Sequence, residues 1–329
     1  MRRLATAVAQ LFAVVLIVFI VLRAIPGDSI TSLLPPNATP EDAQALIRAL
    51  GLDLPVWQQF LLWLRAAVSG DLGLSIQART SVSGLILDAL PMTLELVISG
   101  LGLGIVLGIG MGLLAFRWRG TLGERVIDVI NNVAQSIPGF LWGLLLILTF
   151  CVAWQVMPSI GPIDPDMVVP RVTGLILIDA LVAGDMAAFI SRLEHMILPA
   201  VAIAMTKAPT IVRVLRSSLL EVYNEPFIEY ARLRGVDETR VLIKHAFRNA
   251  ALPTISLLGV QAGYLFGGTL LIEGMYSLPG LGGLTLAAIR THDIPLIQGV
   301  TLTYCIVVLA LNALVDVAYL ALNPRLRPS

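Results

Sequence analysis

The one long charged stretch of this chain runs from residue 217 to residue 253. It mixes cations with anions: Arg232, Arg234, Arg240, Lys244, Arg248, Glu221, Glu225, Glu229, Asp237 and Glu238. Guanidinium and ammonium groups form ion pairs with carboxylates and phosphates. This stretch could therefore dock to a charged partner protein or to lipid headgroups. The alternative is a solvated loop whose charges only fix its side of a membrane. These residues alone leave both interpretations open.

Lys207 is the second residue of chemical interest, because it interrupts an apolar run. An ionisable group in such a run is costly and usually faces a cavity or a partner. One hypothesis is that Lys207 faces a translocation path and meets a substrate carboxylate or a transient counter-ion. The other is that it snorkels, or pairs with Glu95 or Asp316 for structure. Glu95 itself lies near the end of its run, where snorkelling is easy.

A third group, Gln135, Ser136 and Pro138, lies where another apolar run is interrupted by Pro138-Gly139. Proline removes a backbone donor, so we expect a kink about a third of the way along this run. The kink either lines or gates a path through the membrane or serves helix packing only, and both alternatives stay open.

Several kinds of chemistry find no support in the sequence. It contains no GxxxxGK[ST] phosphate loop, no HExxH and no GxSxG. Its two cysteines, Cys151 and Cys305, lie in apolar runs, and its three histidines lack zinc-type spacing. We therefore predict no catalytic residue, no metal site and no cofactor bound by this chain.

Composition places these residues in a membrane protein. Of the 329 residues, 57% are hydrophobic and 13% are charged, and the mean hydropathy is +0.86. Globular proteins average about 25% charged residues. The net charge of zero gives no indication of nucleic-acid binding.

Six segments are long and apolar enough for spanning helices: 7–25, 92–116, 130–154, 196–216, 253–275 and 297–321. Glycines in the second of these segments let another helix approach closely: Gly102, Gly104, Gly108, Gly110 and Gly112.

Lysine and arginine placement sets the expected orientation. Most of the 22 Lys and Arg residues fall in segments on the side of the N-terminus, which indicates a cytoplasmic N-terminus. Six spans then place both termini, and the charged stretch, in the cytoplasm. We predict a first transmembrane helix over 1–26, a periplasmic segment over 27–90 and a core membrane domain over 91–329, with a loop at 217–252. Within 27–90, residues Trp57 to Val68 predict an amphipathic helix at the membrane interface.

The charged stretch has local helix signals. Glu225-Pro226 suits a helix start, and Gly235 suits the left-handed residue that ends one. A second helix from about Glu238 to Asn249 then runs toward Pro253. Ala231 and Gly235 are small enough to leave room for another protein. The pattern predicts a short helix–turn–helix presented to a partner.

This stretch resembles the EAA loop of ABC importer permeases. The resemblance rests on Glu229-Tyr230-Ala231, on Gly235 after three intervening residues and on Leu252-Pro253. Tyr230 departs from the family pattern, which has alanine there. Other motifs match dipeptide and oligopeptide permeases in order along the whole chain: 22–28, 50–55, 70–75, 90–96, 136–138, 245–250, 279–282, 293–299 and 323–325.

The resemblance implies an all-α integral membrane protein with six transmembrane helices, the type I ABC importer permease fold and a cytoplasmic coupling helix. It implies a bacterial inner-membrane location and a heterodimer with a homologous second permease. Two ATPase subunits, which carry ATP and magnesium, and a periplasmic or lipid-anchored binding protein complete the complex. The residues that carry over as ATPase-coupling positions are Glu229, Tyr230, Ala231, Arg232, Gly235 and Arg248. Asp71, Asp164 and Asp166 are candidate contacts for the binding protein.

The expected substrates are di- or oligopeptides. Within the same family, the substrate is alternatively a nickel chelate, glutathione, or an opine- or sugar-like compound. Two rivals come from other classes. An ion-driven secondary transporter predicts inverted repeats and paired acids at the midplane, and neither is evident. An intramembrane enzyme predicts a catalytic pair inside the spans, which offer mainly Glu95, Lys207 and Asp316.

Overall fold

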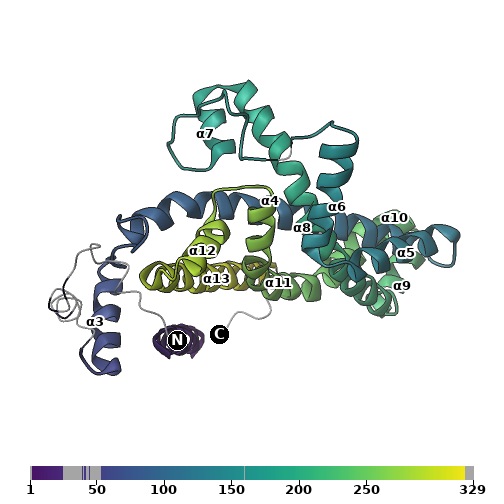
Figure 1. Cartoon of the computed structure of the whole chain (residues 1–329). Coiled ribbons are helices and arrows are strands. Elements are labelled where there is room, and N and C mark those ends of the chain that lie inside the picture. Colours follow the sequence, from purple (N-terminus) through teal and green to yellow (C-terminus); the bar gives the residue numbers. More distant parts are fainter. Residues whose placement is uncertain are drawn as a thin grey trace. The chain divides into compact units, whose positions relative to one another are not determined.

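Helices make up the regular structure of this chain (Figure 1). The computed structural model describes residues 2–24, 39, 41, 44, 53–158 and 160–322. Within those ranges the only strand-type pairing is a single bridge between Leu74 and Ser81. The predicted all-α class is therefore confirmed. Motif residues 25–28, 50–52 and 323–325 lie outside the described part.

The predicted spanning segments coincide with long helices. Five are continuous: α1 (Arg2–Ala24), α4 (Val82–Arg117), α8 (Met186–Val222), α11 (Phe247–Met275) and α13 (Ile294–Leu322). Among the described residues, α4, α8 and α13 are long and apolar enough to cross a membrane by length and composition. A bent pair of helices gives a fourth if the pair is counted as one span.

That bent pair corrects the prediction for residues 130–154. Instead of one kinked helix, α5 (Leu122–Ser136) meets α6 (Gly139–Leu146) at an angle of 102°, and η2 (Ile147–Ala153) continues α6 as a π-helical turn. Ile137 and Pro138 both have extended backbones, so the helical hydrogen bonding stops there completely. The sequence predicted the position of the interruption at Pro138 correctly. The chain there is broken into two helices rather than kinked within one helix.

Shorter helices connect the long ones. They are α3 (Val56–Val68), α7 (Ile176–Ala183), α9 (Pro226–Leu233), α10 (Glu238–Arg240), η3 (Val241–Ala246) and α12 (Leu281–Arg290). The predicted amphipathic helix is α3: it buries Phe60 against Val15 and Phe19 of α1, while Trp57 is exposed. Its apolar face and its exposed tryptophan agree with an interfacial helix.

The chain divides into two units. Unit 1 comprises residues 1–93 and 279–309, and unit 2 comprises residues 94–278 and 310–329. In unit 1 the buried carboxylate of Asp293 accepts hydrogen bonds from the Ser75 hydroxyl at 2.5 Å and from the Gln77 backbone at 3.2 Å. These bonds tie the loop before α4 to the residue that directly precedes α13.

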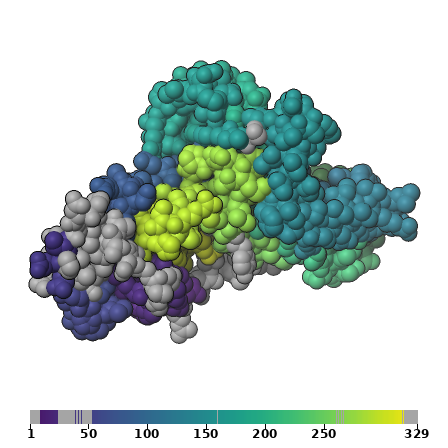
Figure 2. Space-filling model, viewed as in Figure 1, coloured from purple at the N-terminus to yellow at the C-terminus, as the bar shows by residue number. Residues whose placement is uncertain are grey.

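Unit 2 is organised around α8, which contacts α5, α6, α7 and α11. In Figure 1, α7 lies near the start of α8, and α9 and α10 lie near its other end. The space-filling view shows the residues from about 160 to 190 as one continuous lobe of this unit (Figure 2). The segments at the two ends of α8 hold the features described below.

A glycine stripe on α4 lets α8 approach closely. A Cβ atom added at Gly100 or Gly108 would lie 2.7 Å from Ile203 or Ile211, and one at Gly112 would lie 3.1 Å from Leu215. These glycines, with Gly104, recur every fourth residue and so share one helix face. The glycine-rich contact was predicted, but Gly102 and Gly110 of the predicted set face open space instead.

Candidate functional site

The helix α9 begins and ends as its sequence predicts. Glu225 has an extended backbone and precedes Pro226 at the first helical position. At the other end Gly235 adopts φ +75°, its N–H bonds the Arg232 carbonyl at 2.8 Å, and the Val236 N–H bonds the Ala231 carbonyl at 3.2 Å. This pair of bonds is a Schellman motif, which requires a left-handed residue at Gly235.

The second helix of the charged stretch is longer than predicted. The Asp237 carboxylate caps it by accepting from the Thr239 N–H at 2.9 Å. Helical structure then continues through α10, η3 and α11 without ending at Asn249, so the predicted boundary is wrong. Pro253 lies inside α11. Proline is tolerated inside membrane helices because neighbouring groups satisfy the freed backbone carbonyl.

One face of α9 packs against the rest of unit 2. Ile228 and Ala231 are buried, 0% and 9% exposed, in a cluster with residues of α4, α8, η3 and α11: Phe116, Leu215, Leu219, Val241, Leu242, Ala246 and Ala250. The small side chain of Ala231 therefore makes room for this chain's own packing. The expectation that Ala231 leaves space for a partner protein needs this correction.

The opposite face of α9 is apolar and exposed. Phe227, Tyr230 and Leu233 are 40%, 69% and 78% exposed. They recur every third residue, so they form one stripe along the helix. Glu229 and Arg248 are exposed as well. The residues carried over from the resemblance thus lie on both faces of the helix.

A stack of aromatic rings and guanidinium groups fixes α9 to the ends of α4 and α8. Arg232 donates to both carboxylate oxygens of Glu238, at 3.1 and 2.7 Å, and lies 5.1 Å from the ring centre of Tyr223. The ring centres of Tyr223 and Phe116 are 4.5 Å apart, and the guanidinium of Arg119 lies 5.5 Å from the Tyr223 ring centre. Burial, and then the Glu238 charge, raise the pKa of Tyr223 to about 12. The ring therefore stays a neutral platform at physiological pH.

The residues predicted to form a bend lie directly against α8. Arg213 donates to the Gln135 side chain, and the Ser136 hydroxyl donates to the Asn132 carbonyl at 2.7 Å. A Cβ atom at Gly139, just after Pro138, would lie 3.0 Å from Thr206. The structure thus brings the bend next to the turn of α8 that carries Lys207.

Lys207 has a different partner from those considered in the sequence. Its ammonium donates to the Gln261 side-chain oxygen of α11 at 3.3 Å. Glu95 forms an ion pair with Arg192 instead, so the suggested Lys207–Glu95 pair is wrong. The side chain of Asp316, the other suggested partner, lies outside the described part of the chain.

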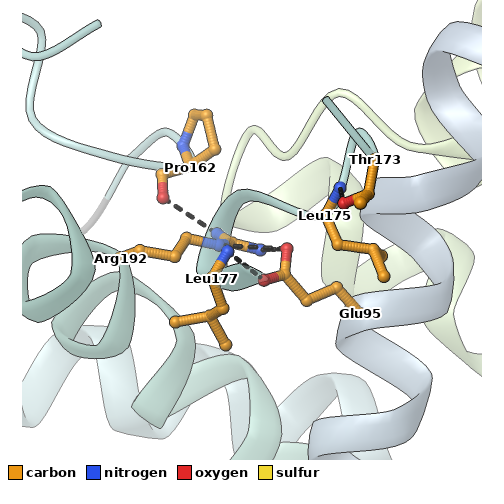
Figure 3. Close-up of polar contacts among 6 residues, drawn as sticks. All are labelled: Glu95, Pro162, Thr173, Leu175, Leu177 and Arg192. Atoms are coloured by element: carbon orange, nitrogen blue, oxygen red, sulfur yellow. Dashed lines mark hydrogen bonds and ion pairs between the residues drawn. The ribbon is translucent and has the colours of Figure 1, made fainter. Parts of the chain in front are cut away.

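Figure 3 shows the ion pair that holds Glu95. Arg192 donates to Glu95 at 3.0 Å and to the Pro162 carbonyl at 2.8 Å, and the Leu177 N–H donates to the second Glu95 oxygen at 2.8 Å. Arg192 and Glu95 are 0% and 5% exposed. Glu95 is therefore buried and paired, and the expectation that it snorkels is wrong.

Of the acids predicted to meet a binding protein, two are engaged by their own surroundings. Asp164 accepts from the Ser191 hydroxyl at 2.7 Å, and Asp71 accepts from the Gly73 N–H at 2.9 Å. Asp166 is exposed. Their proposed contacts stay predictions.

Sequence reasoning missed Arg192, Tyr223 and Asp179. Arg192 was counted only as a topological charge, although it lies four residues before the predicted apolar segment 196–216. Asp179 is 2% exposed, and its carboxylate accepts from the Thr173 hydroxyl at 2.6 Å and from three backbone N–H groups of the preceding loop. An acid inside the apolar segment 175–183 was the available signal.

Comparison with known proteins identifies the chain. Residues 100–328 match the family described as "Binding-protein-dependent transport system inner membrane component", and residues 1–97 match "Binding-prot-dependent transport system membrane comp, N-term". The chain belongs to this family. It is thus a permease component of an ABC importer.

Relatives match this permease over its whole length. The dipeptide transport system permease protein DppB of Escherichia coli strain K12 is 36% identical, covering 99% of this permease and 98% of the relative. The di/tripeptide permease protein DppB of Pseudomonas aeruginosa is 33% identical over 99% and 97%. The glutathione transport system permease protein GsiC of Escherichia coli is 31% identical over 99% and 97%.

The fold also matches a solved transporter. An inward-facing structure of the MetNI methionine ABC transporter superposes with a TM-score of 0.55 at 18% identity, covering 73% of this permease and 96% of that chain. The likeness bears on the fold, which is that of a type I importer permease.

The structure shows which contacts the residues of several sequence motifs make in this permease. In unit 1, Ser75 of one motif bonds Asp293 of another, and the Thr93 hydroxyl accepts from the Leu281 N–H at 2.8 Å. In unit 2, Glu95 holds Arg192. These motif residues tie distant segments together, whereas most of those on α9 face outward.

Proposed function

We propose that this chain is one permease subunit of an ATP-driven importer for di- or oligopeptides. The relatives named for dipeptide and di/tripeptide transport support the substrate class, because the chain and these relatives match over nearly their whole lengths. Glutathione is the second candidate, since a permease named for it is 31% identical over 99% of the chain. Glutathione is itself a peptide-like compound with free carboxylates.

The proposed partners are a homologous second permease, two ATPase subunits and a periplasmic or lipid-anchored binding protein. ATP and magnesium bind the ATPases, and this chain holds no cofactor. The proposed location is the bacterial inner membrane, with both termini and α9 in the cytoplasm. The division at residues 26 and 90 stays part of this proposal.

The exposed stripe of Phe227, Tyr230 and Leu233 is the observation that carries the proposal. Two aromatic residues and a leucine exposed on one short helix form the apolar centre that a protein partner can bury. Glu229 and Arg248 add charges near this surface. We infer that α9 docks in a cleft of the ATPase.

The inner face of α9 explains how docking can drive transport. Ile228 and Ala231 pack in one cluster with residues of α4, α8 and α11, so a displacement of α9 is passed on to these helices. Close-packed interiors transmit displacement because they compress little. Closure of the two ATPases on ATP would therefore reorient the spans and release the substrate inward.

The experiment is reconstitution of the complex encoded with this chain, in proteoliposomes with the binding protein outside. We expect uptake of radiolabelled dipeptide that requires ATP, and copurification of the ATPase subunits. Leu233→Glu should reduce copurification strongly, because it places a charge in the centre of the docking surface. Leu122→Glu is the matched control, since Leu122 is 75% exposed on α5. Uptake that persists without ATP, or equal loss in both variants, would contradict the proposal.

A further inference from the structure

The position of Lys207 in α8 places its charge inside the membrane. From residue 196 to residue 212 Lys207 is the only ionisable residue, with His195 directly before this run and Arg213 directly after it. At 1.5 Å per residue the run is about 26 Å long along the helix. That length is close to the hydrocarbon thickness of a bilayer, about 30 Å. Lys207 lies about 9 Å from Arg213, within the inner half of this run.

The side chain of Lys207 is held between helices of unit 2. A Cβ atom at Gly104 of α4 would lie 3.2 Å from the Lys207 Cβ, so the glycine makes room for the lysine stem. Its ammonium reaches the Gln261 side-chain oxygen on α11 at 3.3 Å. Lys207 is partly buried, and so is Gln261.

No carboxylate of the described side chains lies within 4.0 Å of the Lys207 ammonium. Its one recorded partner, Gln261, is neutral. Glu95 forms an ion pair with Arg192, as Figure 3 shows. A cation in an apolar run without an anionic partner is costly, and an anion that arrives beside it lowers that cost.

Lys207 and Gln261 together can still donate hydrogen bonds to a ligand. Lys207 has three N–H donors, and one of them bonds Gln261. Gln261 uses its oxygen in that bond and retains its NH₂ group, which can only donate. Two donor groups, one of them charged, match the two oxygens of a carboxylate.

The turn of α8 that carries Lys207 also contacts the start of α6, next to the bend between α5 and α6. Thr206, next to Lys207, is the residue that a Cβ at Gly139 would contact at 3.0 Å. A break in a spanning segment is the place where polar groups can line a path.

We propose that Lys207 and Gln261 form a subsite that binds the carboxylate of the peptide as it crosses the membrane. This inference rests on the proposed peptide transport and deepens it. It makes Lys207 a specificity-determining residue: the permease favours substrates with a free carboxylate over those in which that group is blocked.

The test compares a radiolabelled dipeptide with its C-terminal amide in the reconstituted complex. The same binding protein is used with every variant. Its own preference therefore cancels when the ratio of kcat/KM for the free dipeptide to kcat/KM for the amide is divided by the wild-type ratio. Lys207→Met should lower kcat/KM for the free dipeptide about 10- to 100-fold relative to the amide, as expected for a lost hydrogen bond to a charged group. Lys207→Arg should restore most of the preference. Gln261→Glu should also lower transport of the free dipeptide, because it places a competing carboxylate on Lys207.

Lys244→Met is the control, since Lys244 is exposed and lies outside the run. It should change transport of both peptides equally, if at all. Equal loss for the free dipeptide and the amide in Lys207→Met would assign Lys207 a structural role and overturn the subsite. Unchanged transport of both would overturn it too. If the wild-type complex transports neither peptide, the proposed peptide function itself fails, and the subsite with it.

Discussion

Two charge pairs hold the segments at opposite ends of α8, and they differ in burial. Glu95 and Arg192 are 5% and 0% exposed. Glu95 also accepts from the Leu177 N–H of α7, and Arg192 also donates to the Pro162 carbonyl. At the other end the side chains of Arg232 and Glu238 are 41% and 44% exposed. Water screens the second pair but not the first. We infer that the Glu95 end is a fixed anchor, whereas the α9 end is free to rearrange when a partner docks.

The largest expected effect comes from breaking the buried pair. Glu95→Leu would leave the Arg192 guanidinium buried without a counter-charge, which costs about 3–5 kcal/mol of stability. We expect a large drop in the apparent Tm of the detergent-solubilised protein. The double variant Glu95→Leu with Arg192→Met removes both charges and should recover much of the loss.

Glu229→Leu is the control for this comparison, because Glu229 is exposed on α9 and should change Tm little. If the double variant unfolds as readily as Glu95→Leu, an uncompensated buried charge is not the cause. The anchor would then depend on the shape of the two side chains.

A smaller effect is expected at Asp179, which orders the loop before α7. Burial alone would raise the pKa of this carboxyl, but the hydrogen bonds from Thr173 and the loop backbone outweigh burial and lower the pKa. The charged form therefore stabilises the fold above the unfolded pKa of about 3.9, and this contribution is lost as pH falls through the lowered folded value. Asp179→Ala should cost about 1.5–3 kcal/mol, the range for hydrogen bonds to a charged group.

Hydrogen exchange of the loop amides at Thr173 and Gly174 measures this directly. The protection of these amides, relative to the intrinsic exchange rate at each pH, should fall in Asp179→Ala at neutral pH, and in the wild type only in strong acid. Asp166→Asn is the control, because Asp166 is exposed. Equal exchange in the two variants would show that the carboxylate does not hold the loop.

At the α9 end, the backbone of Gly235 gives the next prediction. A Cβ atom there would meet nothing within 4 Å, so a substitution adds no clash and acts only through φ +75°. A β-branched residue in this conformation costs about 1–2 kcal/mol. We expect Gly235→Val to disturb the end of α9, so that ATP hydrolysis continues while peptide uptake falls.

Gly235→Asn serves as the matched variant, because asparagine tolerates the left-handed conformation. It should retain coupling, measured as peptide transported per ATP hydrolysed. Equal uncoupling in both variants would mean that a side chain at this position obstructs docking itself.

The sequence was informative where a local pattern decides the structure. Glu225-Pro226 and Gly235 placed the ends of α9, because helix start and stop signals act within one turn. The apolar runs located the long helices, and their glycines indicated a close helix contact. Asn249 was a poor boundary because Pro253 usually ends helices in water, and membrane helices tolerate it.

Long-range partners were not predictable in the same way. Glu95 and Arg192 are separated by 97 residues, and no local signal shows that they pair. The stack of Phe116, Tyr223 and Arg119 likewise depends on where α4 and α8 end relative to each other. Lys207 was recognised as unusual from its apolar surroundings, but its partner Gln261 became evident only from the packing of α8 against α11.

The smallest effect is expected for the exposed pair at the α9 end. Its hydrogen bond with Arg232 lowers the pKa of Glu238, so the pair stabilises the fold above the ordinary glutamate pKa and is lost as pH falls through the lowered value. Because both side chains are well exposed, Arg232→Gln should cost only about 0–1 kcal/mol. We expect a Tm close to that of the wild type, in contrast to Glu95→Leu, together with a measurable loss of transport per ATP, since Arg232 also lies on the Tyr223 ring. A Tm loss as large as that of Glu95→Leu would show that both ends of α8 are fixed, and the division into an anchored and a rearranging end would be wrong.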